Sequence, residues 1–387
     1  AVLAAVIIII FFIPYTASGF AACGKLFSSL FGMNYMTAMI ISAVVIVAYT
    51  TAGGFFAASA TDFVQSIIMT VAIVFVLVFS TISAGGVDAV VENAKALPGY
   101  LSLTASYIED TGKSEPYNLL HIITTLSWGL GYFGMPHILL RFMAIEDEKK
   151  LRLSRRVASV WVVIAMAMAV LIGIVGRALS NTGLVDQLHG NDTETIIVRV
   201  AHLLSTYGAF PAIMAGLILA GILASTMSTA DSQLLAAASS VSENILREAF
   251  HLKISEKKSM LAARLTVIGI AILGIIIARN PDSSVFGIVS FAWAGFGAAF
   301  GPLVICSLFW KRTTLPGAIA GMASGGAMVF IWKYLIKPIG GVFGIYELLP
   351  AFLVGLVLMV IVSLCTKAPS KEITDEFDRV KAMGKAK

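Results

Sequence analysis

One stretch of the chain, LASTMSTADSQLL, places several hydroxyl side chains and a carboxylate in an otherwise apolar run. At 100° per residue of an α-helix, Ser225, Ser228, Thr229 and Ser232 fall within an arc of about 100°. Hydroxyl, carbonyl and carboxylate oxygens are the ligands that hard cations such as Na⁺ prefer. Asp231 lies about 60° beyond the stripe, and a carboxylate in an apolar helix is costly unless it has a function. We therefore predict a sodium-binding face; contact between membrane helices is the alternative for the hydroxyls alone.

An acidic side chain in a second apolar stretch, SATDFVQSIIM, leaves two alternatives open. Thr61 or Asp62 stands where a helix would start, and N-capping is the commonest role of these residue types there. A carboxylate at this place equally suits an ion ligand or a coupling carboxylate. Gln65 and Ser66 share a face with Asp62, which extends the polar surface.

The stretch LSWGLGYFGMPHILLRF is predicted to contain a broken or kinked helix. Gly129, Gly131 and Gly134 precede Pro136, and in a helix interior Gly costs about 1 kcal/mol and Pro about 3 kcal/mol. A broken membrane helix exposes backbone N–H and C=O groups where it lines a cavity, and solutes bind at such breaks in transporters. A plain proline kink is the alternative.

Aromatic side chains stand beside this break. Trp128 and Tyr132 are four residues apart on one helix face and would cover the apolar part of a small zwitterion; aromatic packing is the alternative. His137 and Arg141 follow at the same spacing, and we predict structural or snorkelling roles for them. Tyr15, one residue after a proline in FFIPYTASG, is a weaker candidate for the same pocket.

A further stretch, SFAWAGFGAAFGP, alternates small residues with Trp293, Phe296 and Phe300. Small residues permit close approach of helices and local flexing. A gate or hinge helix and simple close packing both fit this pattern.

The composition identifies the kind of protein that must position these residues. Of 387 residues, 58% are apolar and 13% are charged, against roughly 25% charged in soluble domains. This composition excludes a soluble globular protein, a disordered chain and a disulfide scaffold. The net charge of +5 does not indicate a nucleic-acid partner, because Lys and Arg cluster in short loops between apolar runs. The chain contains no P-loop, HExxH, CxxC or GxSxG motif, so we expect neither an enzyme nor a cofactor.

A helix needs about 20 apolar residues to cross a bilayer, and the chain offers ten such runs. The ten predicted spans are Ala1–Leu30, Thr37–Phe56, Asp62–Ala84, Leu119–Ile145, Val157–Leu179, Gly208–Glu243, Ser259–Ala278, Val285–Trp310, Pro316–Leu335 and Gly344–Leu364. The class is therefore an all-α polytopic membrane protein.

The distribution of positive charge predicts the orientation. With ten spans, the Lys- and Arg-rich loops after the fourth, sixth and eighth spans fall on the same side as the C-terminus, which is predicted to be cytoplasmic. We expect residues 1–369 to form the transmembrane domain and residues 370–387 a charged cytoplasmic tail. Because the chain begins with Ala inside an apolar run, we expect earlier helices to precede it.

These stretches together resemble the sodium/solute symporters over essentially the whole chain. FFIPYTASG, SWGLGYFGMPHILLRFMA, MSTADSQLL and SFAWAGFGAAFGP carry the resemblance. It implies a LeuT-like transporter core of five plus five helices in an inverted repeat. The first three spans would be core helices three to five, the next five spans core helices six to ten, and the last two spans C-terminal additions. The first two core helices would be missing.

The resemblance also implies roles for single residues. Ser228 and Thr229 match the sodium-ligating hydroxyl pair on core helix eight, and Ser225 matches a position that contributes a backbone carbonyl. Asp62 matches an acidic position involved in sodium handling. Asp231 and Ser232 occupy positions that bind a second sodium ion in some relatives.

Substrate residues follow from the same resemblance. Tyr15, Trp128 and Tyr132 match pocket residues that imply L-proline as the solute, whereas Met135 stands where the family pattern has Gln. We therefore expect sodium-coupled uptake of proline across the cell inner membrane, with Na⁺ as the coupling ion. A symporter of pantothenate or another amino acid is the alternative; other classes are a sensor or channel on the same scaffold, or an intramembrane enzyme using Asp62 and Asp231.

Overall fold

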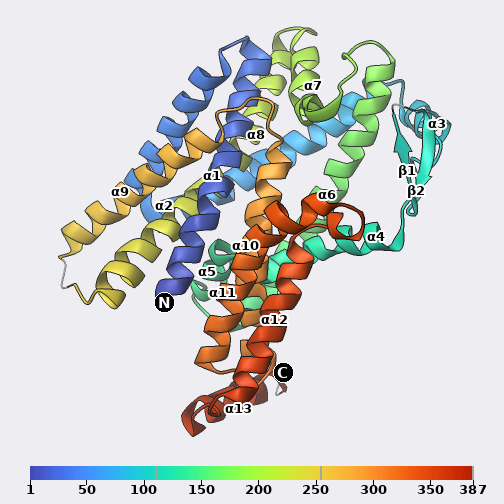
Figure 1. Ribbon diagram of the computed structural model, residues 1–387. Helices are drawn as coiled ribbons and strands as arrows, with labels where there is room; N and C mark the ends of the chain where they lie inside the picture. Colours follow the sequence, from blue (N-terminus) through green and yellow to red (C-terminus); the bar gives the residue numbers. More distant parts are fainter. Residues whose placement is uncertain (110, 253–254, 386–387) are drawn as a thin grey trace.

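The computed structural model describes residues 1–109, 111–252 and 255–385, which are helical over most of their length (Figure 1). Within these ranges, nine helical segments are long and apolar enough to cross a membrane. The remaining predicted span, the fourth (Leu119–Ile145), is broken into shorter pieces. The elements are α1 (Val2–Phe31), α2 (Tyr35–Ser83), α3 (Val87–Ala96), β1 (Ala105–Ile108), β2 (Lys113–Pro116), α4 (Leu119–Leu126), a 3-10 segment (Ser127–Gly134), α5 (Pro136–Met143), α6 (Leu151–Asn181), α7 (Ile196–Ser205), α8 (Ala209–Ser239), α9 (Glu256–Ile277), α10 (Val285–Phe309), α11 (Leu315–Ile331), α12 (Leu348–Cys365) and α13 (Lys371–Lys385).

The second and third predicted spans are joined in the single helix α2. Its helical backbone is interrupted at Gly54, which has φ 65° and ψ −172°, a conformation that glycine adopts without steric cost. Thr61 and Asp62 lie in the continuous helix beyond this interruption, so the N-cap alternative for them is wrong. Asp62 instead presents its carboxylate from the second turn of the membrane-spanning segment Ala58–Ser83.

The predicted break in the fourth span is confirmed. The chain passes from α4 into the 3-10 segment, becomes extended at Met135 (φ −78°, ψ 106°) and re-enters a helix with Pro136 at its start. A Cβ atom at Gly131 would collide with the Trp293 indole, and one at Gly134 would collide with the carbonyl oxygen of Phe296. The two glycines therefore allow the broken segment to lie directly against α10.

Helix α10 forms the centre of the bundle and packs against α1, the broken segment, α11 and α12. Its residues from Ala292 to Pro302 are all buried. The ring of Phe11 on α1 occupies the space that a side chain at Gly295 would need. The small residues of this helix thus serve close packing in this structure.

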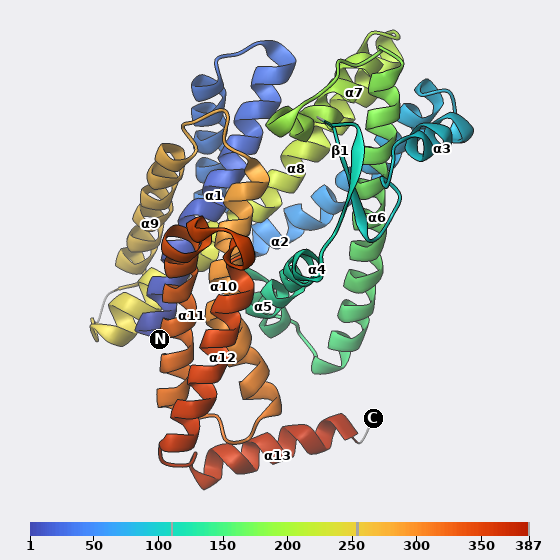
Figure 2. The same cartoon turned by 45° about the vertical axis from the view of Figure 1, so that its right-hand side comes forward.

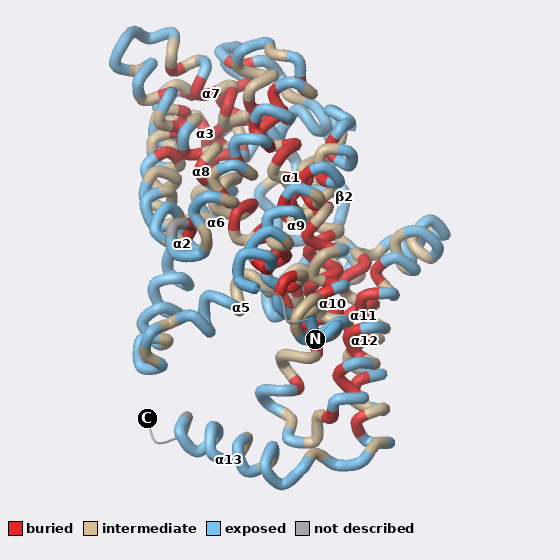
Figure 3. Tube along the Cα trace, turned by 90° about the vertical axis from the view of Figure 1, so that its left-hand side faces the viewer, coloured by how far each residue is buried: buried red, intermediate tan, exposed pale blue. Residues whose placement is uncertain are grey.

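The outside of the bundle is apolar. Large hydrophobic side chains such as Phe63 and Val163 are 69% and 68% exposed, and buried residues concentrate in the middle of the bundle (Figure 3). A soluble protein would not expose so much apolar surface, whereas lipid covers it in a membrane. The exposed faces support the assignment to a multi-pass membrane protein.

Short elements cover the two ends of the bundle. Helix α3, the β1–β2 hairpin and α7 lie toward one end, and α13 runs across the other (Figure 2). The carboxylate of Glu194, just before α7, lies 2.8 Å from Nζ of Lys25 on α1. It also accepts hydrogen bonds from the backbone N–H groups of Val285 and Phe286 and from the Ser284 hydroxyl. Glu194 thereby caps the first turn of α10.

Candidate functional site

The hydroxyl stripe of α8 gathers three oxygens at one place. The Ser228 and Thr229 hydroxyls donate to the backbone carbonyl of Ser225, at 3.2 Å and 3.0 Å. Each hydroxyl oxygen retains lone pairs that can accept a cation. Hydrogen bonds of this kind also occur in hydroxyls that serve packing alone. The predicted stripe therefore exists as a cluster of a carbonyl and two hydroxyl oxygens.

Asp231, next to this stripe on α8, lies in the interior of the protein. Its side chain is fully buried, and its Oδ2 accepts a hydrogen bond from the Tyr49 hydroxyl of α2 at 2.5 Å. The same hydroxyl lies 3.1 Å from the carbonyl oxygen of Met227. Sequence analysis did not identify Tyr49, because its partner is 182 residues away along the chain.

Asp62 and Ser232 are brought together by a residue that was predicted to be structural. Arg141, on α5, forms an ion pair with Asp62 on α2. Its Nη2 also donates to the Ser232 hydroxyl of α8 at 2.7 Å. The Ser232 hydroxyl in turn lies 3.2 Å from Oδ1 of Asp231. The guanidinium of Arg141 thus contacts two of the predicted site residues, which is consistent with the structural role predicted for it.

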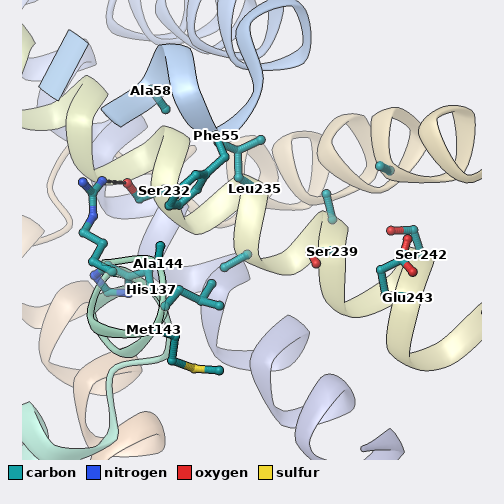
Figure 4. Close-up of a pocket in the computed structure, with 15 residues that line it drawn as sticks. Phe55, Ala58, His137, Met143, Ala144, Ser232, Leu235, Ser239, Ser242 and Glu243 are labelled. Carbon is teal, nitrogen blue, oxygen red and sulfur yellow. Dashed lines mark hydrogen bonds between the residues drawn. The ribbon is translucent and has the colours of Figure 1, made fainter. Parts of the chain in front are cut away.

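A cavity of about 540 Å³ opens beside this network (Figure 4). Arg141 and Ser232 line it, and the hydrogen bond between them is the dashed line of Figure 4. Phe55, His137 and Glu243 contribute other parts of the wall. The polar network thus borders an accessible space.

The predicted aromatic pocket residues form a stack at the break. The Trp128 ring lies 5.3 Å from the Trp293 ring with their planes 12° apart, and 5.2 Å from the Phe286 ring. Tyr346, which precedes α12, stacks on Trp128 at 5.7 Å. Tyr132 meets Trp293 edge-on at 4.8 Å. Trp128 and Tyr132 therefore share one aromatic wall built on α10.

Tyr15 lies at the other end of the broken segment. Its ring is 5.9 Å from that of His137 and 6.5 Å from that of Phe296. The structure thus places Tyr15 beside α5, next to the residues that follow the break. Sequence analysis did not identify Trp293 or Tyr346 as members of this aromatic group, because they become neighbours of Trp128 only through the packing of α10 and α12.

The chain resembles known transporters along nearly all of its length. A family model described as the sodium:solute symporter family matches residues 1–325. Sodium/proline symporter 2 of Staphylococcus saprophyticus is 38% identical over 390 residues, covering 99% of this chain and 73% of that protein. The osmoregulated proline transporter OpuE of Bacillus subtilis is 39% identical over 370 residues, covering 96% and 71%. The high-affinity proline transporter PutP of the same organism is 38% identical, covering 96% and 74%.

A solved structure shares the fold. A Na⁺-coupled sialic acid symporter in a substrate-bound outward-open state superposes with a TM-score of 0.74 at 18% identity, covering 95% of this chain and 75% of that one. The predicted LeuT-like transporter architecture is thereby confirmed. Together, the sequence match over residues 1–325 and the relatives above 30% identity show that the chain belongs to the sodium:solute symporter family.

Proposed function

We propose that the protein is a secondary active transporter that couples sodium entry to the uptake of L-proline. The support from sequence is the similarity, at 38–39% identity over 96–99% of the chain, to relatives named as proline transporters. The observation that carries the proposal is the cluster of Ser225, Ser228 and Thr229 oxygens on α8, together with an aromatic wall at a broken helix.

Sodium would bind at the α8 cluster. The Ser225 carbonyl and the hydroxyls of Ser228 and Thr229 are neutral oxygens, which suit a hard monovalent cation better than a soft metal. Turning the two hydroxyl hydrogens away from the Ser225 carbonyl would free all three oxygens for the ion. We propose that Asp62, Asp231 and Ser232 form a second cation position between α2 and α8.

Proline would bind at the break, between the aromatic wall of Trp128 and Tyr132 at one end of the broken segment and Tyr15 at the other. Its charged ends would meet backbone groups at the break in the helix, around the extended Met135. The glycines of the broken segment bring this backbone close to α10. Met135, fully buried, would set the depth of the pocket where the family pattern has Gln.

Coupling would follow from the shared use of core helices. An ion that holds α8 in one position would order the pocket for proline, and by linkage proline would tighten sodium binding by the same factor. Alternating exposure of this site to the two sides would move both solutes. We propose an orientation with the C-terminus in the cytoplasm, because the Lys- and Arg-rich loops lie on that side.

Uptake of radiolabelled proline into proteoliposomes tests the proposal. An inward sodium gradient should drive accumulation, and replacing sodium with potassium or adding excess unlabelled proline should abolish it. Equal uptake with either ion would contradict sodium coupling. Sodium-driven uptake of pantothenate or another amino acid in place of proline would support sodium-coupled symport but would show that proline is not the substrate.

A further inference from the structure

His137, the second residue of α5, stands between the proposed solute site and the cavity. Its ring lies 5.9 Å from the Tyr15 ring and 5.8 Å from the Phe12 ring, both on α1. The same side chain lines the cavity of about 540 Å³ (Figure 4). A solute that leaves Tyr15 for this cavity would therefore pass the imidazole.

The cavity extends from His137 toward the end of the bundle that we place in the cytoplasm. Ser239, Ser242 and Glu243 contribute to its wall. Glu243 forms an ion pair with Arg247 in the segment that follows α8, where one of the Lys- and Arg-rich loops begins. The cavity thus connects the surroundings of Tyr15 with the side on which the solute would be released.

The imidazole of His137 has hydrogen-bonding capacity that the protein does not use. Its Nδ1 is buried and has no partner, and Nε2 forms no hydrogen bond to any described residue either. Buried polar side chains that serve only the fold are normally hydrogen-bonded. Packing against Phe12 and Tyr15 holds the ring in place, so a ring nitrogen remains available to a ligand in the cavity.

The ligand group that suits this position is the carboxylate of a small zwitterion. A neutral imidazole has one N–H donor, and a hydrogen bond from it to a carboxylate is stronger than one between neutral groups. Arg141 lies one turn further along α5 and lines the same cavity, so its positive charge favours the negative end of the solute here. Arg141 itself donates to Asp62 and Ser232, whereas His137 has a free donor.

We propose that His137 binds the carboxylate of the solute as the solute moves from Tyr15 into the cavity that faces the cytoplasm. The inference rests on the proposed transport function and deepens it, because it adds a solute-binding residue on the path of release. This residue lies beyond the break in the helix, on the side away from the aromatic wall of Trp128 and Tyr132.

Two substitutions separate this role from ring packing. His137→Phe keeps an aromatic ring against Phe12 and Tyr15 and removes both nitrogens, whereas His137→Gln keeps an N–H donor and removes the ring. In equilibrium binding of radiolabelled proline at saturating sodium, His137→Phe should bind about tenfold more weakly than wild type, the loss expected for one hydrogen bond to a charged group. His137→Gln should bind more tightly than His137→Phe. His121→Phe is the matched control, because His121 packs against Tyr117 at 4.5 Å and is not part of the cavity wall.

Chemical modification of the wild-type protein gives a test that does not depend on the folding of a variant. Diethyl pyrocarbonate acylates neutral imidazole nitrogens, and mass spectrometry locates the modified histidines. Proline in the presence of sodium should lower the modification of His137 severalfold and leave that of the exposed His121 unchanged.

Three results would overturn the inference. They are tight proline binding by His137→Phe, binding by His137→Gln as weak as that by His137→Phe, and no protection of His137 by proline. A wild-type protein that does not bind proline at all would contradict the proposed function itself, so the two failures are distinguishable.

Discussion

Lys25 on α1 forms an ion pair with Glu194, which lies just before α7. The same carboxylate accepts a hydrogen bond from the backbone N–H of Val285 in the first turn of α10. Burial alone would raise the pKa of the Glu194 carboxyl, but hydrogen bonds from Lys25, from the backbone of Val285 and Phe286 and from Ser284 outweigh it. The pKa of Glu194 therefore lies below its ordinary value. One carboxylate thus joins α1, the segment before α7 and the start of the central helix.

The first prediction concerns the pH dependence of this cap. A carboxyl group whose pKa is lowered on folding stabilises the protein above its unfolded-state pKa, and the effect is lost as the pH falls through the folded value. Glu194→Gln should destabilise the protein at pH 7 by about 0.5–1 kcal/mol, as for a charge at a helix N-terminus. In thermal melting, the difference in stability between wild type and Glu194→Gln should decrease as the pH is lowered. Asp192→Asn, at an exposed position two residues earlier, is the matched control; a gap that persists at low pH would contradict the prediction.

The second prediction concerns the α8 oxygens. Ser228→Ala and Thr229→Ala each remove a proposed ligand, so the sodium concentration for half-maximal proline uptake should rise about tenfold or more, which corresponds to about 1.4 kcal/mol. Thr226→Ala is the control, because its hydroxyl bonds to the Ile222 carbonyl one turn away from the cluster. If all three variants keep the wild-type sodium dependence, the stripe serves helix packing.

The third prediction concerns the buried pair of Tyr49 and Asp231. Tyr49→Phe removes the 2.5 Å hydrogen bond to a fully buried carboxyl group and should cost about 1–3 kcal/mol of stability. A double-mutant cycle with Asp231→Asn should show strong coupling between the two changes. Additive effects would mean that the hydrogen bond between Tyr49 and Asp231 contributes little to stability.

The Asp231→Asn variant also tests the proposed cation site. If the sodium dependence of its proline uptake is unchanged, Asp231 does not bind the coupling cation.

The fourth prediction separates two glycines of the broken helix. Gly134→Ala should destabilise the protein by about 1–3 kcal/mol or more, because its Cβ would collide with the carbonyl oxygen of Phe296 on α10. Gly129→Ala should be tolerated, since nothing lies within 4 Å of a Cβ there. Expression level and thermal melting measure both. An equal loss of stability in both variants would show that the broken segment requires backbone flexibility rather than close packing against α10.

Local sequence patterns predicted those parts of the structure that depend on neighbours in the chain. Apolar length located the spans, the Gly and Pro residues located the break at Met135, and helical spacing located the α8 stripe. The residue types near Asp62 could not show whether a helix starts there or runs through it. In the structure, Gly54 interrupts α2, and Asp62 lies within the helix that continues beyond it. The roles of Tyr49 and Arg141 could not be predicted, since their partners lie 79 to 182 residues away and meet them only through packing.

The stack of Tyr346 on Trp128 places a residue of the C-terminal helices against the proposed substrate wall. The Tyr346 hydroxyl also donates to the Ser290 carbonyl of α10 at 2.5 Å, and its neighbour Glu347 is buried with Lys337 at 2.9 Å. A substitution of Tyr346 changes the surroundings of Trp128 and leaves the residues of α2 and α8 unchanged. The segment before α12 can therefore change the proposed solute site without any change to the proposed sodium ligands on α8.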